Sequence, residues 1–333
     1  MRNDFPFLQQ TVHGQPIAYF DNAATTQKPQ VVLDALMEFY TTCNANVHRG
    51  IYTHAECATE RYEGARATLA SFIGVHHSEI IFTRGATEGI NLVANAWAMH
   101  HLKPQDEIVI TQLEHHANLL PWWQVARNTG ALLKIIPVEA DGTINLERFL
   151  DAITVRTKLV SVVHTSHVTG THLPVGLIAN RAHEVGARVL VDAAQSIVHQ
   201  QVDVQSLAVD FLVFSGHKMV GPTGIGVLYI ARALHDQMMP YQWGGGMVKE
   251  VRLSFVDTQE MPHRLEAGTP AIAQAIGLSV AADYLRKFDI DAMQEHEAAL
   301  CTHFIKAAIL MPRIHLVGSI SSRMIIDGFK ISN

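Results

Sequence analysis

The middle of this chain alternates short β-branched and apolar runs with segments of helical periodicity, and this alternation limits the folds open to it. The runs are continuously apolar, which is typical of strands buried on both faces. Such a pattern predicts an α/β fold with a mostly parallel central sheet flanked by helices. The expected strands are 80–83, 107–111, 132–138, 159–163, 189–191 and an apolar run from 211, and the expected intervening helices are 90–100, 122–129, 146–153 and 175–185.

The pattern changes near the C-terminal end of the chain. Glycine and proline become frequent from 221 to 226 and again from 244 to 246, and two long helical segments follow at 271–286 and 290–311. This change indicates a crossing into a second lobe. The expected parts are an N-terminal segment over 1–20 that packs with the small domain, a large cofactor-binding domain over 21–270, and an incomplete small α+β domain over 271–333.

Composition excludes several classes of function. A formal charge of −6, with basic residues scattered along the chain, gives no electrostatic attraction for nucleic acid. No apolar stretch is long enough to span a bilayer, and the N-terminal residues lack a basic-then-apolar leader. The three cysteines, Cys43, Cys57 and Cys301, have unrelated spacings that do not predict a disulfide framework. We therefore expect a cytoplasmic protein that contacts neither nucleic acid nor membrane.

Histidine is unusually frequent, with twenty in the chain and three adjacent pairs, His76-His77, His100-His101 and His115-His116. Adjacent histidines point in different directions on a strand or a helix, so one pair rarely chelates one metal ion. No Cys-x-x-Cys or His-Glu-x-x-His pattern accompanies them. The sequence therefore predicts no metal site.

Two strand-like runs deliver complementary side chains at their carboxyl ends. Asp192 ends the run that begins at Val189, and Lys218 follows the run that begins at Phe211. In parallel sheets ligands collect outside the carboxyl ends of the strands. A lysine amine forms the Schiff base with pyridoxal 5′-phosphate (PLP), and a carboxylate keeps the pyridine nitrogen protonated, so that the ring accepts electrons. The pairing predicts a PLP site.

Other polar residues fall at the same sheet edge. Gly85-Ala-Thr87 follows a strand and opens a helix, where backbone N–H groups and the Thr87 hydroxyl can cradle a phosphate, although the same residues alone describe a capped turn. Ser215 and His217 are suitable further phosphate donors. Gln195 can reach the phenolic oxygen, and His115 can stack on the ring and move protons. Their joint placement favours cofactor binding over separate structural roles.

A set of short motifs runs in a fixed order along the chain: Tyr19–Thr26, Asn46–Gly50, Arg84–Asn91, Glu114–Asn118, Val191–Ser196, Ser215–Lys218, Gly221–Gly226 and Glu266–Pro270. With these motifs the chain resembles the group II (Suf-type) cysteine desulfurases, a branch of the class V PLP-dependent enzymes, over nearly its whole length. The resemblance implies a fold-type I PLP enzyme that works as a homodimer, takes sulfur from L-cysteine and leaves L-alanine, and passes the sulfur as persulfide to an acceptor protein for iron–sulfur cluster assembly.

Carried over residue by residue, the resemblance implies a role for each matching position. Lys218 is the Schiff-base lysine and proton carrier, and His115 stacks on the ring. Asp192 pairs with the pyridinium, and Gln195 with the phenolic oxygen. The implied phosphate ligands are Thr87, Ser215 and His217 within one subunit, with Thr269 reaching the phosphate of the neighbouring subunit. The implied substrate entrance is lined by Asn22, Ala23, Ala24, His48 and Arg49.

Two positions in these motifs depart from the family pattern. His167 in Thr165–Gly170 stands where an asparagine usually contacts the phenolic oxygen and the substrate. A histidine still donates a hydrogen bond there, but it is larger and titrates near neutral pH. Ala86 replaces a usual threonine and keeps the backbone N–H that faces the phosphate.

A third departure concerns the acceptor cysteine. In this family it lies on a loop beyond the equivalent of residue 333, followed by an arginine that binds the substrate carboxylate. We therefore expect a C-terminally truncated chain that binds PLP and is poor or inactive in desulfuration, with an unpaired strand edge around 324–326. The three cysteines match no acceptor motif and are expected to be small buried packing residues. A selenocysteine lyase, another class V enzyme and a non-catalytic fragment stay open as alternatives.

Overall fold

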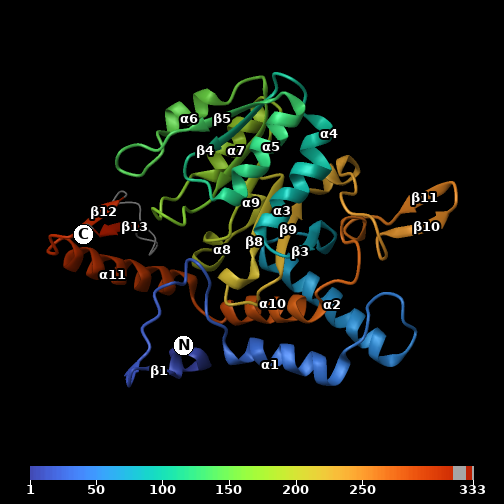
Figure 1. The fold of residues 1–333 in the computed structure, drawn as a ribbon, viewed down its shortest axis with the longest axis horizontal. Helices are drawn as coiled ribbons and strands as arrows, with labels where there is room; N and C mark the ends of the chain where they lie inside the picture. Colours follow the sequence, from blue (N-terminus) through green and yellow to red (C-terminus); the bar gives the residue numbers. More distant parts are fainter. Residues whose placement is uncertain (318–327, 332–333) are drawn as a thin grey trace. The chain divides into compact units, whose positions relative to one another are not determined.

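The computed structural model describes residues 1–317 and 328–331 (Figure 1). The strand edge expected around 324–326 lies outside the described residues. Among the described residues, no helix combines the length and the apolar character that a bilayer crossing requires.

A seven-stranded sheet forms the centre of the fold, in the order β3-β9-β8-β7-β6-β4-β5. Strands β4, β5, β6 and β7 pair in parallel, whereas β3 and β9 are antiparallel. The mostly parallel sheet predicted from the apolar runs is therefore confirmed, and β3 pairs antiparallel with β9 at its edge. The strands are β3 (Ile80–Thr83), β4 (Glu107–Thr111), β5 (Leu132–Ile136), β6 (Thr157–Val163), β7 (Arg188–Asp192), β8 (Phe211–Ser215) and β9 (Gly226–Ile230).

Helices follow most strands, as expected for an α/β chain. They are α1 (Gln30–Glu38), α2 (Thr53–Phe72), α3 (Ala86–Val93), α4 (Met99–His101), α5 (Leu120–Thr129), α6 (Leu146–Ala152), α7 (Val175–Glu184), α8 (Ser196–His199), α9 (Val204–Leu207), α10 (Ile272–Leu285) and α11 (Ile290–Ala308). The helix expected over 90–100 is interrupted by a π-helical turn at Ala94–Ala98. Short strands make three further antiparallel pairs among the described residues: β1 (Thr11–Val12) with β2 (Gln15–Pro16), β10 (Val248–Arg252) with β11 (Phe255–Thr258), and β12 (Ile314–Val317) with β13 (Gly328–Ile331).

The chain divides into two compact units. The first comprises Met1–Leu92 and Val213–Lys287, and the second comprises Val93–Leu212 and Phe288–Asn333. In the first unit, α10 packs against both α1 and α2 (Figure 1). Helix α10 is accordingly buried around most of its circumference, and a Cβ on Gly277 would lie 2.8 Å from the Pro222 side chain. In the second unit, α5, α6 and α7 cover strands β5, β6 and β7.

The cysteines depart from expectation. Cys43 and Cys57 form a disulfide with a Cα–Cα separation of 6.3 Å, so the prediction of no disulfide was wrong. Cys43 ends the turn after α1 and Cys57 lies on α2, and the chain between them folds back; their separation in sequence gave no sign of this pairing. Cys301 is a buried cysteine on α11 that takes no part in the disulfide, and its burial is as expected. The cytoplasmic location stays a prediction.

Candidate active site

The turn between β3 and α3 lies against the end of β8 in the first unit. The Ala86 backbone N–H donates to the Ser215 hydroxyl at 2.8 Å. A Cβ on Gly85 would lie 3.1 Å from the same oxygen, and one on Gly226 would lie 2.5 Å from the Gly85 Cα atom, so only glycine fits this crossing. Thr87 is exposed beside it, in the first turn of α3. The structure thus brings Ser215, Ala86 and Thr87 together at a helix N-terminus, where an anion is favoured, and their binding of a phosphate stays a prediction.

The segment that carries Lys218 is fixed by residues near the N-terminus. A 3-10 turn, Gly216–Lys218, follows β8. The His217 carbonyl accepts from the Thr26 backbone N–H and from its hydroxyl, each at 2.9 Å, and the Thr26 hydroxyl also accepts from the Val220 N–H at 2.9 Å. Val220 has a φ of 54°, which is costly for a β-branched residue and is held only where the surroundings enforce it. Thr26 therefore positions the lysine segment.

This role of Thr26 was not predicted, although Thr26 is the last residue of the motif Tyr19–Thr26. The expected residues of that motif, Asn22, Ala23 and Ala24, lie on a turn in which the Ala24 N–H donates to the Asp21 carbonyl at 3.1 Å. They lie in the same motif, with Thr25 between them and the anchoring Thr26. The contact between positions 26 and 217 is long-range and has no sequence signature.

The surroundings of Lys218 are positively charged. The Lys28 amine donates to the carbonyls of Thr26 and His217. Burial lowers the pKa of Lys28 to about 8. Burial also lowers the pKa of His217, and the charges of Lys218 and Lys28 lower it further. The amines of Lys28 and Lys218 and the imidazole of His217 thus lie in the part of the first unit that contains the N-terminus of α3. These amines and the helix N-terminus attract a phosphate dianion.

The second unit brings together His115 and His167. His115 follows β4 and is exposed, and its Nδ1 accepts from the Ala117 N–H at 3.1 Å, so its neutral ring carries the proton on Nε2. The His167 ring lies edge-on to it, with the centroids 5.0 Å apart and an interplanar angle of 71°. The histidine at the usual asparagine position therefore contacts the residue that is expected to stack on the cofactor.

Asp192 and Gln195 are both buried in the second unit, each 4% exposed. Asp192 ends β7, and its carboxylate accepts from the Ala194 N–H at 3.0 Å. Its backbone carbonyl accepts from the His164 N–H at 2.9 Å. The expected acid thus stands at the carboxyl end of a buried strand, as the sequence predicts.

Beneath His115 lies a buried carboxyl group that was not predicted as part of the site. Glu114 accepts from the Thr111 hydroxyl and from the Asn118 amide, each at 2.6 Å. Burial raises the pKa of Glu114 to about 8, and the charge of Asp192 adds to this, against the hydrogen bonds, which lower it. Near neutral pH the carboxyl group is therefore mostly protonated.

The raised pKa of Glu114 predicts a dependence of stability on pH. Between its ordinary value of 4.5 and about 8, the folded state binds more protons than the unfolded state. The free energy of unfolding should therefore fall as pH rises through this range, by about 1.4 kcal/mol per pH unit. Glu114→Gln should flatten this fall and raise the melting temperature at pH 8, whereas the exposed Glu147→Gln should follow the wild type. Parallel curves for Glu114→Gln and the wild type would contradict the assignment.

Thr269 lines a separate cavity of about 340 Å³ in the first unit. Arg84, Glu88 and Tyr241 line the same cavity, and the Tyr241 hydroxyl donates to the Glu88 carboxylate at 2.7 Å. Ser215, His217 and Lys218 are not in its lining. Thr269 is therefore apart from the cradle of its own chain, and its expected action on a neighbouring subunit stays a prediction.

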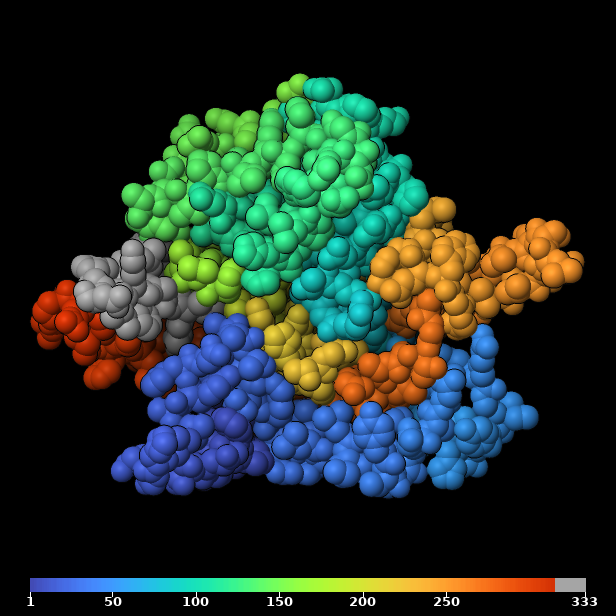
Figure 2. Space-filling view, in the orientation of Figure 1, coloured from blue at the N-terminus to red at the C-terminus, as the bar shows by residue number. Residues whose placement is uncertain are grey.

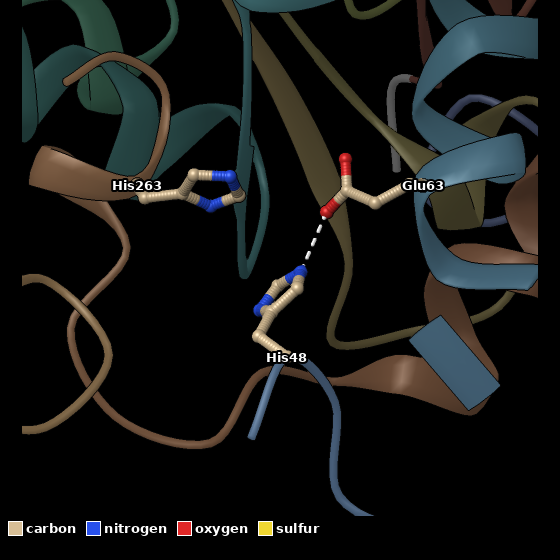
Figure 3. A group of neighbouring side chains, drawn as sticks. All are labelled: His48, Glu63 and His263. Carbon is tan, nitrogen blue, oxygen red and sulfur yellow. Dashed lines mark hydrogen bonds and ion pairs between the residues drawn. The ribbon is translucent and has the colours of Figure 1, made fainter. Parts of the chain in front are cut away.

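His48 and Arg49, expected at the substrate entrance, are exposed on the loop before α2. The His48 Nε2 atom lies 2.8 Å from a Glu63 carboxylate oxygen, and the His48 ring centroid lies 4.9 Å from that of His263 (Figure 3). The Glu63 carboxylate also pairs with Arg66 at 2.9 Å. The structure thus places His48 in a polar network of the first unit.

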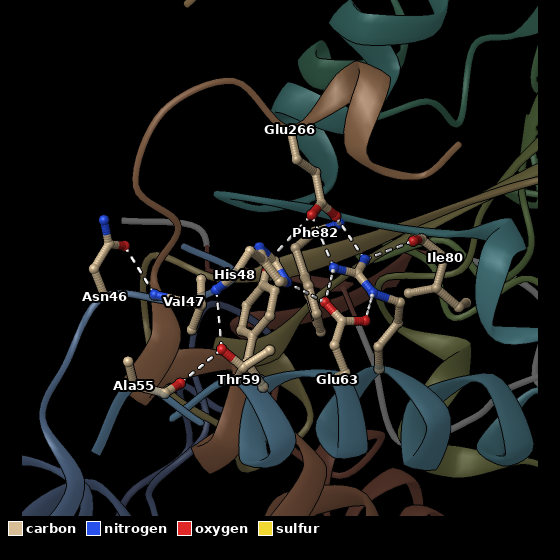
Figure 4. A network of polar contacts seen from close by, with 11 residues as sticks. Asn46, Val47, His48, Ala55, Thr59, Glu63, Ile80, Phe82 and Glu266 are labelled. Atoms are coloured by element: carbon tan, nitrogen blue, oxygen red, sulfur yellow. Dashed lines mark hydrogen bonds and ion pairs between the residues drawn. The ribbon is translucent and has the colours of Figure 1, made fainter. Parts of the chain in front are cut away.

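The same network contains a buried ion pair (Figure 4). The Arg66 guanidinium donates to both carboxylate oxygens of Glu266, at 2.7 and 2.9 Å, and to the Ile80 carbonyl at 2.9 Å. Glu266 also accepts from the Phe82 N–H at 2.7 Å. Glu266 begins the motif that contains Thr269, so this pair ties that loop to α2 and β3.

Comparison with known proteins identifies the family. The model of the aminotransferase class-V family matches residues 18–324. A probable cysteine desulfurase of Mycolicibacterium paratuberculosis is 46% identical over 333 residues, which is 100% of this chain and 49% of that protein. A cysteine desulfurase of an Enterobacter species is 46% identical over 320 residues, 96% of this chain and 79% of that protein. The chain spans about half the length of several curated relatives that it matches.

The fold agrees with these matches. The crystal structure of the cysteine desulfurase CsdA from Escherichia coli superimposes with a TM-score of 0.89 at 38% identity, covering 99% of this chain and 82% of that chain. This chain therefore belongs to the class-V aminotransferase family of PLP-dependent enzymes, and within that family to the cysteine desulfurases.

Proposed function

We propose that this protein is a PLP-dependent cysteine desulfurase of the group II (Suf-type) branch. It removes sulfur from L-cysteine and leaves L-alanine, and the sulfur passes to a thiolate of an acceptor as a persulfide for iron–sulfur cluster assembly. The observation that carries the proposal is Lys218, which follows β8 beside the phosphate cradle in a chain that belongs to this family.

The residues of the first unit fit the phosphate of PLP. The Ala86 N–H and Ser215 hydroxyl stand 2.8 Å apart at the start of α3, and no larger residue than glycine fits at position 226, where the backbone crosses. Lys28 and Lys218, whose charges both act on His217, add positive charge, and the pKa of His217 is lowered, so its ring is neutral and able to donate one N–H. PLP, when bound, supplies an electron sink that the protein side chains lack. The phosphate of PLP would be held by Ser215, Thr87, Ala86 and His217. The amine of Lys218 would be linked covalently to the aldehyde carbon of PLP.

The remaining roles follow the family pattern. We assign to Lys218 the movement of protons to and from the substrate carbon, because an amine held on the turn after β8 can act as acid and as base. We assign to Asp192 the charge that keeps the pyridine nitrogen protonated. Gln195 would donate to the phenolic oxygen. His115 would stack on the ring and keep its Nε2 proton available, since its Nδ1 accepts from Ala117.

His167 would replace the usual asparagine as a donor to the phenolic oxygen. Its contact with His115 couples two titratable rings.

A homodimer is part of the proposal. The hairpin of β10 and β11 extends from the rest of the first unit and carries exposed apolar side chains at Val251, Leu253, Phe255 and Val256 (Figure 2). Exposed apolar clusters of this kind usually meet a partner. We place Thr269 at the phosphate of the second subunit, and Asn22, Ala23, Ala24, His48 and Arg49 at the substrate entrance.

Selenocysteine lyase activity is the second candidate, and the state of the cysteines favours it. Cys43 and Cys57 are joined and Cys301 is buried, so none of the three is an accessible thiolate. A nucleophilic thiolate is needed to take sulfur from the substrate. Weak or absent desulfuration by the 333-residue chain therefore stays a prediction.

One assay separates the candidates. The purified protein is loaded with PLP and given L-cysteine or L-selenocysteine with dithiothreitol as reductant, and alanine is measured by chromatography. Alanine from L-cysteine supports desulfuration, and alanine from L-selenocysteine alone supports the lyase. Pyruvate in place of alanine from both substrates would contradict both candidates, because it shows elimination without proton return to the substrate carbon.

Thr26 gives a test that needs no turnover. Thr26→Val keeps the shape but removes the hydroxyl that fixes the carbonyl of His217 and the N–H of Val220. Each of the two hydrogen bonds contributes about 1 kcal/mol, so PLP should bind up to roughly thirtyfold more weakly. Thr26→Ser keeps the hydroxyl and should bind PLP like the wild type. Equal PLP affinity of the valine and serine variants, measured by equilibrium dialysis, would show that Thr26 does not position the lysine segment.

A further inference from the structure

Three side chains from separate parts of the first unit meet in one cluster. His48 lies on the loop before α2, Glu63 lies on α2, and His263 opens a 3-10 turn, His263–Leu265. One potential ligand atom from each lies within 4.8 Å of the other two. Figure 3 shows the three side chains pointing toward a shared space. The His48 and Glu63 side chains are 35% and 33% exposed, so solvent reaches this space.

We propose that His48, Glu63 and His263 form a binding site for a divalent transition metal ion of the zinc class. Two imidazole nitrogens and one carboxylate oxygen are a donor set that suits zinc. The exposure of the cluster leaves a fourth position for water. This site does not depend on the proposed desulfurase activity.

The distances require only a small adjustment for metal binding. Zinc–ligand bonds of about 2.0–2.1 Å place tetrahedral donor atoms roughly 3.4 Å apart. The His48 and Glu63 atoms are 2.8 Å apart and would separate slightly, whereas the His263 nitrogen would move closer. Side chains with a third of their surface exposed can make such movements by rotation. The backbone need not change.

The charges around the cluster also favour a cation. Arg66 contacts Glu63, but its guanidinium is bound on both nitrogens by Glu266. Two carboxylates and one guanidinium leave one net negative charge beside the two imidazoles. The hydrogen bonds from Arg66 also orient the Glu63 carboxylate, as second partners of metal ligands commonly do.

The backbone supports His48 in this position. His48 has a φ of 70°, a conformation that costs a non-glycine residue energy and that clusters at functional sites. Its N–H donates to the Thr59 hydroxyl at 2.9 Å, and this hydroxyl donates to the Ala55 carbonyl at 2.7 Å (Figure 4). The strained residue is therefore anchored to α2, with its imidazole directed at Glu63.

Zinc titration of the PLP-loaded, chelator-treated protein tests the site. Competition with a chromophoric chelator should show one tight equivalent of zinc per chain. His263→Ala and Glu63→Gln should each weaken that equivalent at least about tenfold. The matched control His303→Ala removes an exposed histidine on α11 and should bind zinc like the wild type. This control shows how much weak zinc binding the histidines outside the cluster contribute. Wild-type protein without a tight equivalent, or unchanged binding in both cluster variants, would overturn the proposal.

Zinc-soaked crystals of the wild-type protein give a second readout that does not depend on the folding of any variant. An anomalous difference peak at the zinc edge should lie between His48, Glu63 and His263. A peak only at another histidine, or at the cofactor phosphate, would overturn the proposal even if one equivalent binds in solution.

Discussion

Lys218→Ala is expected to abolish the covalent attachment of PLP and to lower alanine release at least about a thousandfold, from whichever of L-cysteine and L-selenocysteine the wild type converts. Lys218 is assigned two roles, attachment and proton movement, and a positioned acid–base group alone contributes about 10²–10⁴ in rate. Alanine production and the visible absorbance of PLP-loaded protein are measured together. Circular dichroism of the variant should match the wild type, because Lys218 lies on a turn after β8 rather than inside an element.

Lys28 supplies the matched control for this experiment. The Lys28 side chain is half-buried, and its amine donates to the carbonyls of Thr26 and His217. Because its pKa is about 8, about a tenth of this amine is neutral at pH 7. Lys28 is therefore a second amine able to attack an aldehyde. Lys28→Ala should keep the covalent attachment. Loss of attachment in Lys28→Ala with retention in Lys218→Ala would reverse the assignment of the two lysines.

Glu266→Ala is expected to destabilise the protein by about 3–5 kcal/mol, because it leaves the Arg66 guanidinium buried without its main partner. The Arg66 side chain is 0% exposed and that of Glu266 is 8% exposed. The loss also leaves the Phe82 N–H without its acceptor. Calorimetric melting of the wild type and the variant under identical conditions measures the change.

A surface ion pair provides the comparison. Arg61 pairs with Glu38 at 2.8 Å, but the Glu38 side chain is 58% exposed, so Arg61→Ala should cost less than about 1 kcal/mol. Combining Arg66→Met with Glu266→Leu should cost less than the two single changes together, since neither charge is then left unpaired. A Glu266→Ala protein that melts like Arg61→Ala would mean that the buried pair contributes little to stability.

The sheet could be predicted because its strands are continuous apolar runs. The runs at 80–83, 107–111 and 211–215 form β3, β4 and β8. These strands are buried on both faces, so their sequences do not show the helical pattern of apolar and polar residues that would have indicated another structure. The direction of pairing could not be predicted in the same way. The antiparallel β3–β9 pair depends on which strands become neighbours, and apolar runs carry no such information.

The candidate site was predictable only in part, for a related reason. Ser215 ends β8, and Ala86 follows β3. Because ligands collect at the ends of strands, both residues could be predicted as site residues from the sequence. The hydrogen bonds of Thr26, the pairing of Arg66 with Glu266 and the cluster around His263 join residues about 190 to 215 positions apart. No local pattern marks such contacts, because they depend on how distant elements pack.

Borohydride reduction of the PLP-loaded protein followed by peptide mass mapping tests the central claim most directly. Reduction converts a PLP–lysine linkage into a stable phosphopyridoxyl group, whose added mass reports the modified residue. The account predicts this mass on the peptide containing Lys218 and on no other lysine peptide. A modified Lys28, or no modified lysine in protein that has bound PLP, would contradict the account.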